Sequence, residues 1–246
     1  MDSKPAILFY DIASAPPVTC FAPNPWKTRY ALNFKQAHYQ TEWVELPEVS
    51  SVRKRLGVAA NRVHRDGSPF YTLPIIRNTS TCDIVGDSFE IALYLDRLYP
   101  EGARLFPPST VGLLSAFNSQ VDAIFTQHVI LCLNGMPFNP ETAEESKATF
   151  AKRAGKECWD ELTVRGEERA RTLEGFQGAL GELAKAYRRT EGPFLEGDTA
   201  TYADFIVGSW LKFFKKTMEE WEELQSWHDG LWGELHRALE KYAEDK

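Results

Sequence analysis

The stretch CFAPNPWK, residues 20–27, brings a thiol, a side-chain amide and two prolines together directly after an apolar segment. A cysteine thiolate can attack or exchange sulfur bonds. Asn24 followed by Pro25 is typical of a helix start, where unpaired backbone N–H groups and the helix dipole favour an anion. We therefore predict that a helix begins at Pro25, with Asn24 as its N-cap, and that this end holds an anionic ligand.

Two dipeptides and one basic run also carry side chains suited to binding. Leu73-Pro74 stands at the start of a predicted strand, and Asp87-Ser88 opens a predicted helix with an acid and a hydroxyl. The densest run of basic residues in this acidic chain lies before Leu73, and most of it is expected to be solvated surface. Its members are Arg53, Lys54, Arg55, Arg62, His64 and Arg65.

Composition limits the classes of function. The 246 residues are 43% hydrophobic and 26% charged, with a formal net charge of -7, which argues against nucleic acid as a partner. No window approaches the roughly 20 apolar residues of a membrane span, and no signal peptide is recognised. The four scattered cysteines have no metal-ligand spacing, so we expect free thiols, no metal and a cytoplasmic protein; they are Cys20, Cys82, Cys132 and Cys158.

The elements that position these residues fall into two groups. Apolar runs and turn residues predict a first domain, residues 1–106, of order βαβαββα. From Pro107 to the end, residues 107–246, every predicted element is helical, and Thr201 with Asp204 forms a helix start resembling a capping box. The predicted strands are 6–12, 39–46, one from 73 and 82–85; the predicted later helices are 111–133, 141–154, 157–189, one after 201 and 227–243.

Together these motifs resemble a cytosolic glutathione transferase over nearly the whole chain. The order is a βαβ unit, Leu-Pro at the third strand, an acid-serine pair, and FLEGDTATYADF in an all-helical second domain. The segment APNPWKTRYALNFK is most similar to the corresponding helix of the fungal-specific class A transferases, which are related to bacterial β-etherases. The resemblance implies a thioredoxin-like first domain that binds glutathione, a helical second domain with a hydrophobic substrate pocket, and a homodimer.

The resemblance also implies roles for individual residues. A cis peptide before Pro74 would let the Leu73 backbone pair with the cysteinyl part of glutathione. Ser88 would hold the γ-glutamyl carboxylate and Asp87 its ammonium, although Asp87 can equally be a plain helix cap. One member of the basic run would bind the glycyl carboxylate. The expected glutathione-binding residues are Ala22, Pro23, Asn24, Trp26, Lys27, Leu73, Pro74, Asp87 and Ser88.

The hydroxyl that the resembling class aims at the glutathione sulfur is missing, because the matching residue is Ala22. We expect Asn24 and the backbone N–H at Ala22 to act as catalytic donors instead, with weaker thiolate activation. Cys20 is an alternative that would give disulfide chemistry, and a small buried side chain is its plainer interpretation. Ser14 and Thr19 are other donors on the same loop.

The sequence therefore predicts a transferase that conjugates glutathione, its co-substrate, to hydrophobic aromatic electrophiles, as in detoxification. The alternatives are glutathione-dependent cleavage of aryl ethers, a redox enzyme that uses Cys20, and a non-catalytic binder of aromatic molecules, a ligandin, which Ala22 favours. On the first helix of the second domain, Phe117 and Phe125 are the expected substrate contacts, ahead of Asp122 and His128.

Overall fold

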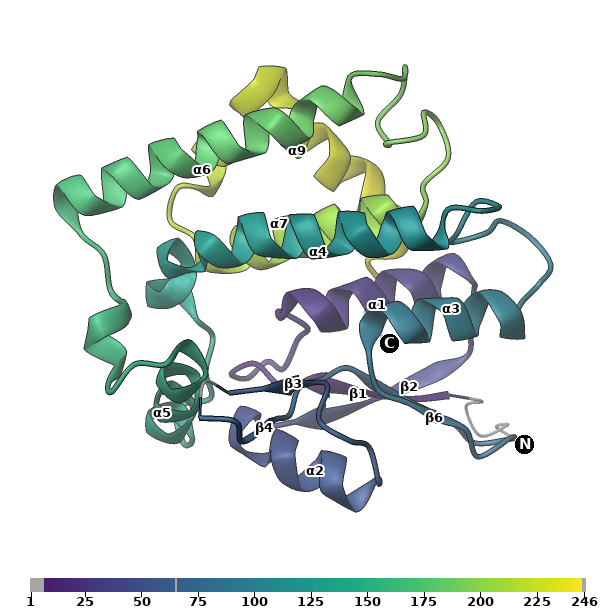
Figure 1. Cartoon of the computed structure of the whole chain (residues 1–246), viewed down its shortest axis with the longest axis horizontal. Coiled ribbons are helices and arrows are strands. Elements are labelled where there is room, and N and C mark those ends of the chain that lie inside the picture. Colours follow the sequence, from purple (N-terminus) through teal and green to yellow (C-terminus); the bar gives the residue numbers. More distant parts are fainter. Residues whose placement is uncertain (1–6, 65, 245–246) are drawn as a thin grey trace.

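The structure is a computed structural model that describes residues 7–64 and 66–244 (Figure 1). The predicted first residue of the first strand, Ala6, and one member of the basic run, Arg65, lie outside the described residues. The chain forms a mixed α/β first domain followed by a helical second domain, which confirms the predicted fold class. The boundary placed after Phe106 lies in the connection between helix α3 (Ser88–Leu98) and helix α4 (Val111–Gln127) and stays a prediction.

The first domain is built on a four-stranded sheet in the order β2-β1-β5-β6. Strand β1 pairs in parallel with β2 and antiparallel with β5, which in turn pairs antiparallel with β6. Strand β1 is buried or half-buried along its whole length, and its sequence ILFYDI is accordingly almost continuously apolar. The strands are β1 (Ile7–Ile12), β2 (Tyr39–Val44), β5 (Ile75–Asn78) and β6 (Ile84–Val85).

Helices α1 and α3 lie between this sheet and the second domain, and α2 lies on the opposite face (Figure 1). Tyr30 and Phe34 on α1 pack against Phe205 of helix α7 (Tyr202–Thr217) in the second domain, so this face of α1 forms part of the domain interface. A short hairpin of β3 and β4 follows α2. The bounds are α1 (Pro23–Phe34), α2 (Val49–Arg55), β3 (Arg62–Val63), β4 (Pro69–Phe70) and α3 (Ser88–Leu98).

Helix α1 begins at Pro23 with Ala22 as its N-cap, so the predicted start at Pro25 is wrong. The backbone N–H of Trp26 donates to the carbonyl of Ala22, which closes the first helical turn two residues earlier than predicted. Proline is as favourable at Pro23 as at Pro25, because its missing N–H and fixed φ suit the first turn equally well. Asn24 therefore lies inside the first turn instead of capping it.

In the second domain, α7 (Tyr202–Thr217) is buried along nearly its whole length and forms the centre around which the other helices pack. The capping box predicted at its start is present, with Thr201 and Asp204 bonding reciprocally. The other helices are α4 (Val111–Gln127), α5 (Ala143–Ala154), α6 (Gly166–Tyr187), α8 (Trp221–Leu224) and α9 (Trp227–Leu239).

Two long predicted helices are divided in the structure. The segment predicted as a helix over 157–189 contains a short 3₁₀ turn, Trp159–Leu162, and then α6. The first helix of the domain ends at Gln127 and continues as a 3₁₀ segment, Val129–Gly135. Helical periodicity continues through such breaks, so the pattern alone does not reveal them. Among the described residues, no helix is long and apolar enough to cross a membrane.

Segment 136–154 of the second domain reaches back over the first domain. The backbone N–H of Ala15 donates to the carbonyl of Pro137 at 2.7 Å. The Glu45 carboxylate accepts hydrogen bonds from Asn139 and Thr142, and the Arg153 guanidinium donates to the carbonyl of Tyr71. These contacts fix the loop after β1, on which the region around Ala22 depends, against the second domain.

Candidate functional site

A polar cavity lies between the two domains, beside the start of α1. Its walls come from the first turn of α1, the segments on either side of β4, the start of α3 and the exposed side of α4. The lining residues are Asn24, Asn61, Arg62, Thr72, Leu73, Pro74, Asp87, Ser88, Asn118 and Asp122. Five of the nine predicted glutathione-binding residues are thus brought together here, namely Asn24, Leu73, Pro74, Asp87 and Ser88.

The first turn of α1 presents few donors to this cavity. Pro23 and Pro25 carry no backbone N–H, so among the first three residues of the helix only Asn24 has one. Ala22 is buried, and the N-cap position makes no side-chain hydrogen bond. Asn24 therefore supplies both the backbone N–H and the side-chain amide of this corner.

The Leu73–Pro74 peptide is cis, as the resemblance implies. Within the described part of the chain, the backbone N–H and C=O of Leu73 form no hydrogen bond with another residue, and Leu73 lines the cavity. A buried backbone group without a partner is costly, so this segment is suited to pairing with the backbone of a peptide ligand.

Arg53 holds this wall in place from behind. Its side chain is buried and donates to the carbonyls of Thr72, Gly86 and Ala59, so one guanidinium fixes both the residue before Leu73 and the residue before Asp87. A Cβ at Gly86 would overlap with Val58 and lie 3.0 Å from the Arg53 guanidinium, so this close approach requires glycine. Arg53 thus positions the site and lies outside its lining.

The other members of the basic run differ in whether their side chains face the cavity. Arg62 lines the cavity. Lys54 lies over the ring of Tyr71, and His64 stacks on Phe70 with the ring centroids 4.6 Å apart. Arg55 is exposed on the last turn of α2. Among the described members of the run, Arg62 is the cation that faces the cavity.

Asp87 caps α3, as predicted. Its Oδ1 accepts hydrogen bonds from the backbone N–H groups of Phe89 and Glu90, and its Oδ2 accepts one from the Asn61 side chain at 3.3 Å. Asn61 in turn accepts a hydrogen bond from Thr72 at 3.0 Å. Ser88 is buried beside this network at the first position of α3, where its hydroxyl and the positive end of the helix dipole favour a carboxylate.

The Lys27 side chain does not line the cavity but bonds to two residues of α4 that do. Its side chain is fully buried, and its ammonium donates to Asp122 Oδ1 at 2.6 Å and to Asn118 Oδ1 at 2.8 Å. Trp210 Nε1 donates to the same Asp122 oxygen at 2.7 Å. Burial lowers the pKa of Lys27, and Asp122 opposes that shift. The predicted ligand contact at Lys27 is thus replaced by Asn118 and Asp122 on the cavity wall.

The remaining predicted contacts lie elsewhere. Trp26 packs in the interface of α1 and α7, where the Lys212 ammonium is 5.0 Å from its ring. Phe125 is completely buried and stacks on Trp210, so its side chain does not line the cavity in this structure. Phe117 and Phe125 are eight residues apart on α4, so their side chains differ in direction by about 80° around the helix axis. Phe125 points into the core, whereas Phe117 is half-buried.

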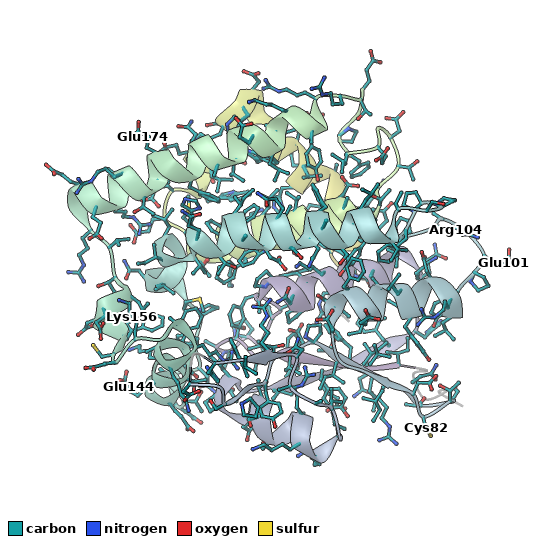
Figure 2. The ribbon with its side chains drawn as sticks, in the orientation of Figure 1. Cys82, Glu101, Arg104, Glu144, Lys156 and Glu174 are labelled. Atoms are coloured by element: carbon teal, nitrogen blue, oxygen red, sulfur yellow. The ribbon has the colours of Figure 1, made fainter. Side chains whose placement is uncertain are left out.

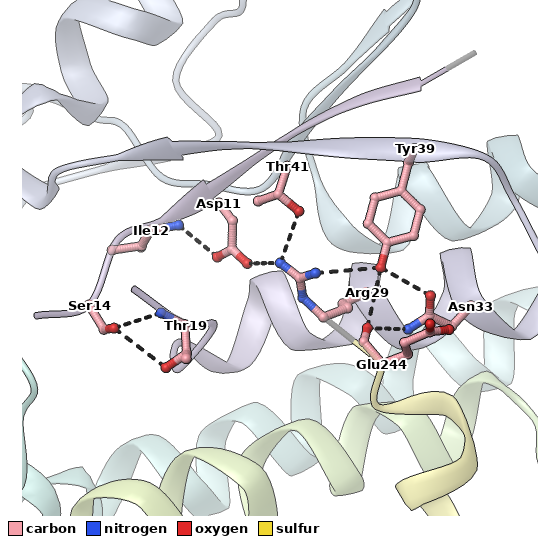
Figure 3. Close-up of polar contacts among 9 residues, drawn as sticks. All are labelled: Asp11, Ile12, Ser14, Thr19, Arg29, Asn33, Tyr39, Thr41 and Glu244. Carbon is pink, nitrogen blue, oxygen red and sulfur yellow. Dashed lines mark hydrogen bonds and ion pairs between the residues drawn. The ribbon is translucent and has the colours of Figure 1, made fainter. Parts of the chain in front are cut away.

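Cys20 is buried behind the site, against Asp11 and Arg29. Burial, followed by the nearby Asp11 carboxylate, raises the pKa of the Cys20 thiol well above its usual range. Figure 3 shows the surrounding network, in which Arg29 donates to Asp11 at 2.9 Å and to Thr41 at 3.3 Å. A thiol in this position is a poor nucleophile, which favours the plainer interpretation of Cys20 as a packing residue.

The other two candidate donors on this loop, Ser14 and Thr19, bond to each other. Ser14 Oγ accepts a hydrogen bond from the Thr19 backbone N–H at 2.8 Å, and the two hydroxyls lie 3.4 Å apart (Figure 3). Both side chains therefore stabilise the loop between β1 and α1, and neither lines the cavity.

Sequence reasoning missed three lining residues, Asn61, Thr72 and Asn118. Asn118 and Asp122 are four residues apart and so share one face of α4, which is a signal that could have identified them as a pair. Asn61 and Thr72 stand in short irregular segments without any periodic pattern. In the described part of the chain, no group of histidine, cysteine or acidic side chains could hold a metal ion.

Comparisons with known proteins agree with this geometry. Residues 21–98 match the family model described as the glutathione S-transferase N-terminal domain, and residues 113–242 match that of the C-terminal domain. The chain is 28% identical to the glutathione S-transferase-like protein ustS of Aspergillus flavus, over 97% of this chain and 92% of that protein.

Solved structures of fungal transferases are similar over the full length. The glutathione S-transferase CsGST63524 of Ceriporiopsis subvermispora, crystallised with glutathione, is 33% identical with a TM-score of 0.89, covering 98% of this chain and 99% of that one. The transferase GSTFuA3 of Phanerochaete chrysosporium is 30% identical with a TM-score of 0.88, covering 99% and 100%. The chain belongs to the glutathione S-transferase family.

Proposed function

We propose that this protein is a glutathione transferase that binds glutathione in the polar cavity between its domains. The single observation that supports this most is the convergence of three features on one cavity: the Asn24 corner of α1, the Leu73 backbone and the start of α3 at Ser88. The similar Ceriporiopsis protein was crystallised with glutathione, which supports the same ligand here. Arg62 is our candidate for one of the two glutathione carboxylates.

The chemistry requires a thiolate from a thiol whose pKa is about 8.5 in water. Lowering that pKa by about two units takes roughly 2.7 kcal/mol, and one hydrogen bond to a charged group contributes about 1.5 to 3 kcal/mol. With alanine at position 22, the donors are the Asn24 amide, the backbone N–H groups at Ala22 and Asn24, and the positive end of α1. We therefore expect transferase activity with weak thiolate activation.

The electrophile is proposed to be a hydrophobic aromatic molecule that approaches from α4 beside Phe117. Phe117 is half-buried on the same helix as two cavity residues, Asn118 and Asp122. The family resemblance also suggests a homodimer, a cytoplasmic location and membership of the fungal-specific class A, to which the likeness to GSTFuA3 lends support.

A second candidate function is non-catalytic binding of aromatic molecules, and the observation that favours it is Ala22. Ether cleavage has weaker support, because the β-etherase LigF of Sphingobium is only 15% identical with a TM-score of 0.61, a likeness of fold alone. The raised pKa of Cys20 argues against a redox enzyme based on that residue.

The test is a conjugation assay with glutathione and a panel of aromatic electrophiles on wild type, Asn24→Ala and Cys20→Ser. We expect Asn24→Ala to lower the rate about tenfold, since it removes one donor to the thiolate, and Cys20→Ser to retain activity. If glutathione and aromatic ligands both bind but no product forms, the protein is a non-catalytic binder and the proposed transferase activity is wrong. Failure of glutathione to bind would overturn both.

A further inference from the structure

A second cavity lies between the end of α4 and the first half of α6. Helix α6 lies on the opposite side of α4 from the first domain (Figure 1). The cavity measures about 600 Å³, a size typical of small-molecule sites. Its lining shares no residue with the polar cavity beside α1, so the proposed transfer reaction makes no use of it.

His128, a lesser candidate for a substrate contact, lines this second cavity instead. It is only 6% exposed, and its ring stacks on Phe176 with the centroids 4.8 Å apart. Its Nδ1 lies 2.7 Å from the carbonyl oxygen of Ile124, and since a carbonyl only accepts, Nδ1 carries the proton. In the neutral ring Nε2 then has a lone pair, for which the described residues offer no hydrogen-bond partner. A buried nitrogen of this kind is suited to a ligand that donates a hydrogen bond.

The other lining groups narrow the chemistry of that ligand. Thr172 Oγ1 donates its hydrogen to the carbonyl of Glu168 at 2.8 Å, so it too offers the cavity only lone pairs. Glu168 and Arg171 are exposed lining residues of opposite charge, which together favour neither an anion nor a cation. Ile130 and Val164 supply an apolar surface. The occupant that fits is uncharged, with an O–H group at one end and an apolar body.

Gly175 on α6 leaves the approach to His128 open. Glycine in a helix interior costs about 1 kcal/mol relative to alanine. A Cβ at Gly175 would lie 3.8 Å from His128 Nε2 and meet no other atom within 4 Å, so packing does not require glycine at this position. Its lack of a side chain keeps Nε2 accessible from the cavity that both residues line.

We propose that this cavity binds an uncharged phenol, whose hydroxyl donates to His128 Nε2 and whose ring packs on Ile130 and Val164. A phenol combines a rigid apolar ring with one polar group, so it loses little conformational entropy on binding. Its O–H is also a stronger donor than that of an aliphatic alcohol. The site is separate from the glutathione cavity, and the inference does not depend on the proposed function.

Calorimetric titration of the full chain with β-naphthol, and with the methyl ether of β-naphthol, tests this. Wild type should bind β-naphthol about five- to tenfold more tightly than the ether, which has the same ring system but no O–H to donate. His128→Phe keeps a ring that can stack on Phe176 and removes the acceptor, so it should bind the two molecules about equally.

A second variant fills the cavity without removing a buried group. Gly175→Leu should weaken β-naphthol binding about tenfold or more, because its side chain occupies the approach to His128. Gly178→Leu is the matched control: it lies on the same helix outside the lining, a Cβ there meets no atom within 4 Å, and it should bind like wild type. Both variants replace a helical glycine, so both should fold.

Three results would overturn the inference: no binding of β-naphthol to wild type, equal binding of its ether, or binding that Gly175→Leu leaves unchanged. The last result would place the phenol elsewhere on the protein. Glutathione conjugation should be the same in Gly175→Leu as in wild type, since the two cavities share no residue. Failure of this inference is thereby distinguished from failure of the proposed function.

Discussion

Lys27 on α1 and Asp122 on α4 form an ion pair of 2.6 Å that joins the two domains at the cavity wall. Lys27 is fully buried, and its partner also accepts from Trp210 on α7. Because one carboxylate connects three helices, the shape of the cavity depends on how the second domain docks on the first. This relationship makes the pair a test of both stability and binding.

Replacing Lys27 with methionine should lower the free energy of unfolding by about 3 kcal/mol, because it leaves Asp122 without its buried counter-charge. Urea unfolding monitored by tryptophan fluorescence measures the change. The double variant with Asp122→Asn should recover a large part of the loss. The exposed pair Lys185–Glu182 gives the control: Lys185→Met should cost less than about 1 kcal/mol. Equal losses for the two lysines would contradict the prediction.

Restoring a hydroxyl at the N-cap of α1 should improve thiolate activation. We expect Ala22→Ser to lower the pKa of the bound glutathione thiol by about one to two units, since one hydrogen bond to a thiolate contributes about 1.5 to 3 kcal/mol. The serine hydroxyl would donate its hydrogen to the sulfur, while its oxygen could still accept from the backbone N–H of Asn24 in the first turn of α1. Ultraviolet thiolate absorbance against pH measures the shift. Ala22→Gly adds no donor and should leave the pKa unchanged; an unshifted Ala22→Ser would show that residue 22 does not face the sulfur.

The four cysteines should differ sharply in reactivity. Cys82, at the turn between β5 and β6 at the edge of the molecule (Figure 2), and Cys158 are exposed, whereas Cys20 and Cys132 are buried. Burial raises the pKa of both buried thiols well above the usual range of a cysteine, so neither forms an appreciable fraction of thiolate near neutral pH. Alkylation followed by mass spectrometry should modify Cys82 and Cys158 in the native protein and the other two only after unfolding. Rapid native labelling of Cys20 would restore the redox alternative.

Asp204 in the capping box of α7 should make stability depend on pH. Burial raises its pKa to about 6 from an ordinary 3.8, although bonds from Leu195 and Thr201 oppose the shift. The folded state therefore holds this proton more tightly than the unfolded chain. The stabilisation is fully present below about pH 4 and is lost as the pH rises through 6, by up to about 3 kcal/mol.

Urea unfolding of wild type and of Asp204→Asn, whose side chain does not titrate, measures this dependence between pH 4 and 7.5. The stability of wild type relative to the variant should fall as the pH rises. A difference that stays constant across this range would show that Asp204 keeps its ordinary pKa in the folded protein.

The residues that follow local rules were predictable from the sequence. Asp87 caps α3, Thr201 and Asp204 form their capping box, and Leu73-Pro74 stands at the cavity because its motif and neighbours agree. The start of α1 was predicted wrongly because Pro23 and Pro25 satisfy the same local rule, so the sequence does not distinguish them.

Other features depend on contacts that are distant in sequence. Lys27 meets Asp122 across 95 positions, and Arg53 meets Gly86 across 33, so no local pattern could indicate which basic residue faces the ligand and which holds the backbone. Phe125 illustrates the same limit, since the face of α4 that packs into the core, where Phe125 stacks on Trp210, depends on residues distant in sequence.

The most direct test of the central claim is a crystal structure of the full chain with glutathione, in which the distances from the sulfur and from the cysteinyl backbone are measured. We predict that the sulfur lies within hydrogen-bond distance of a donor of Asn24 or of the Ala22 backbone N–H, and that the cysteinyl backbone pairs with Leu73. Glutathione bound outside this cavity, or with its sulfur directed away from residues 22–24, would contradict the account.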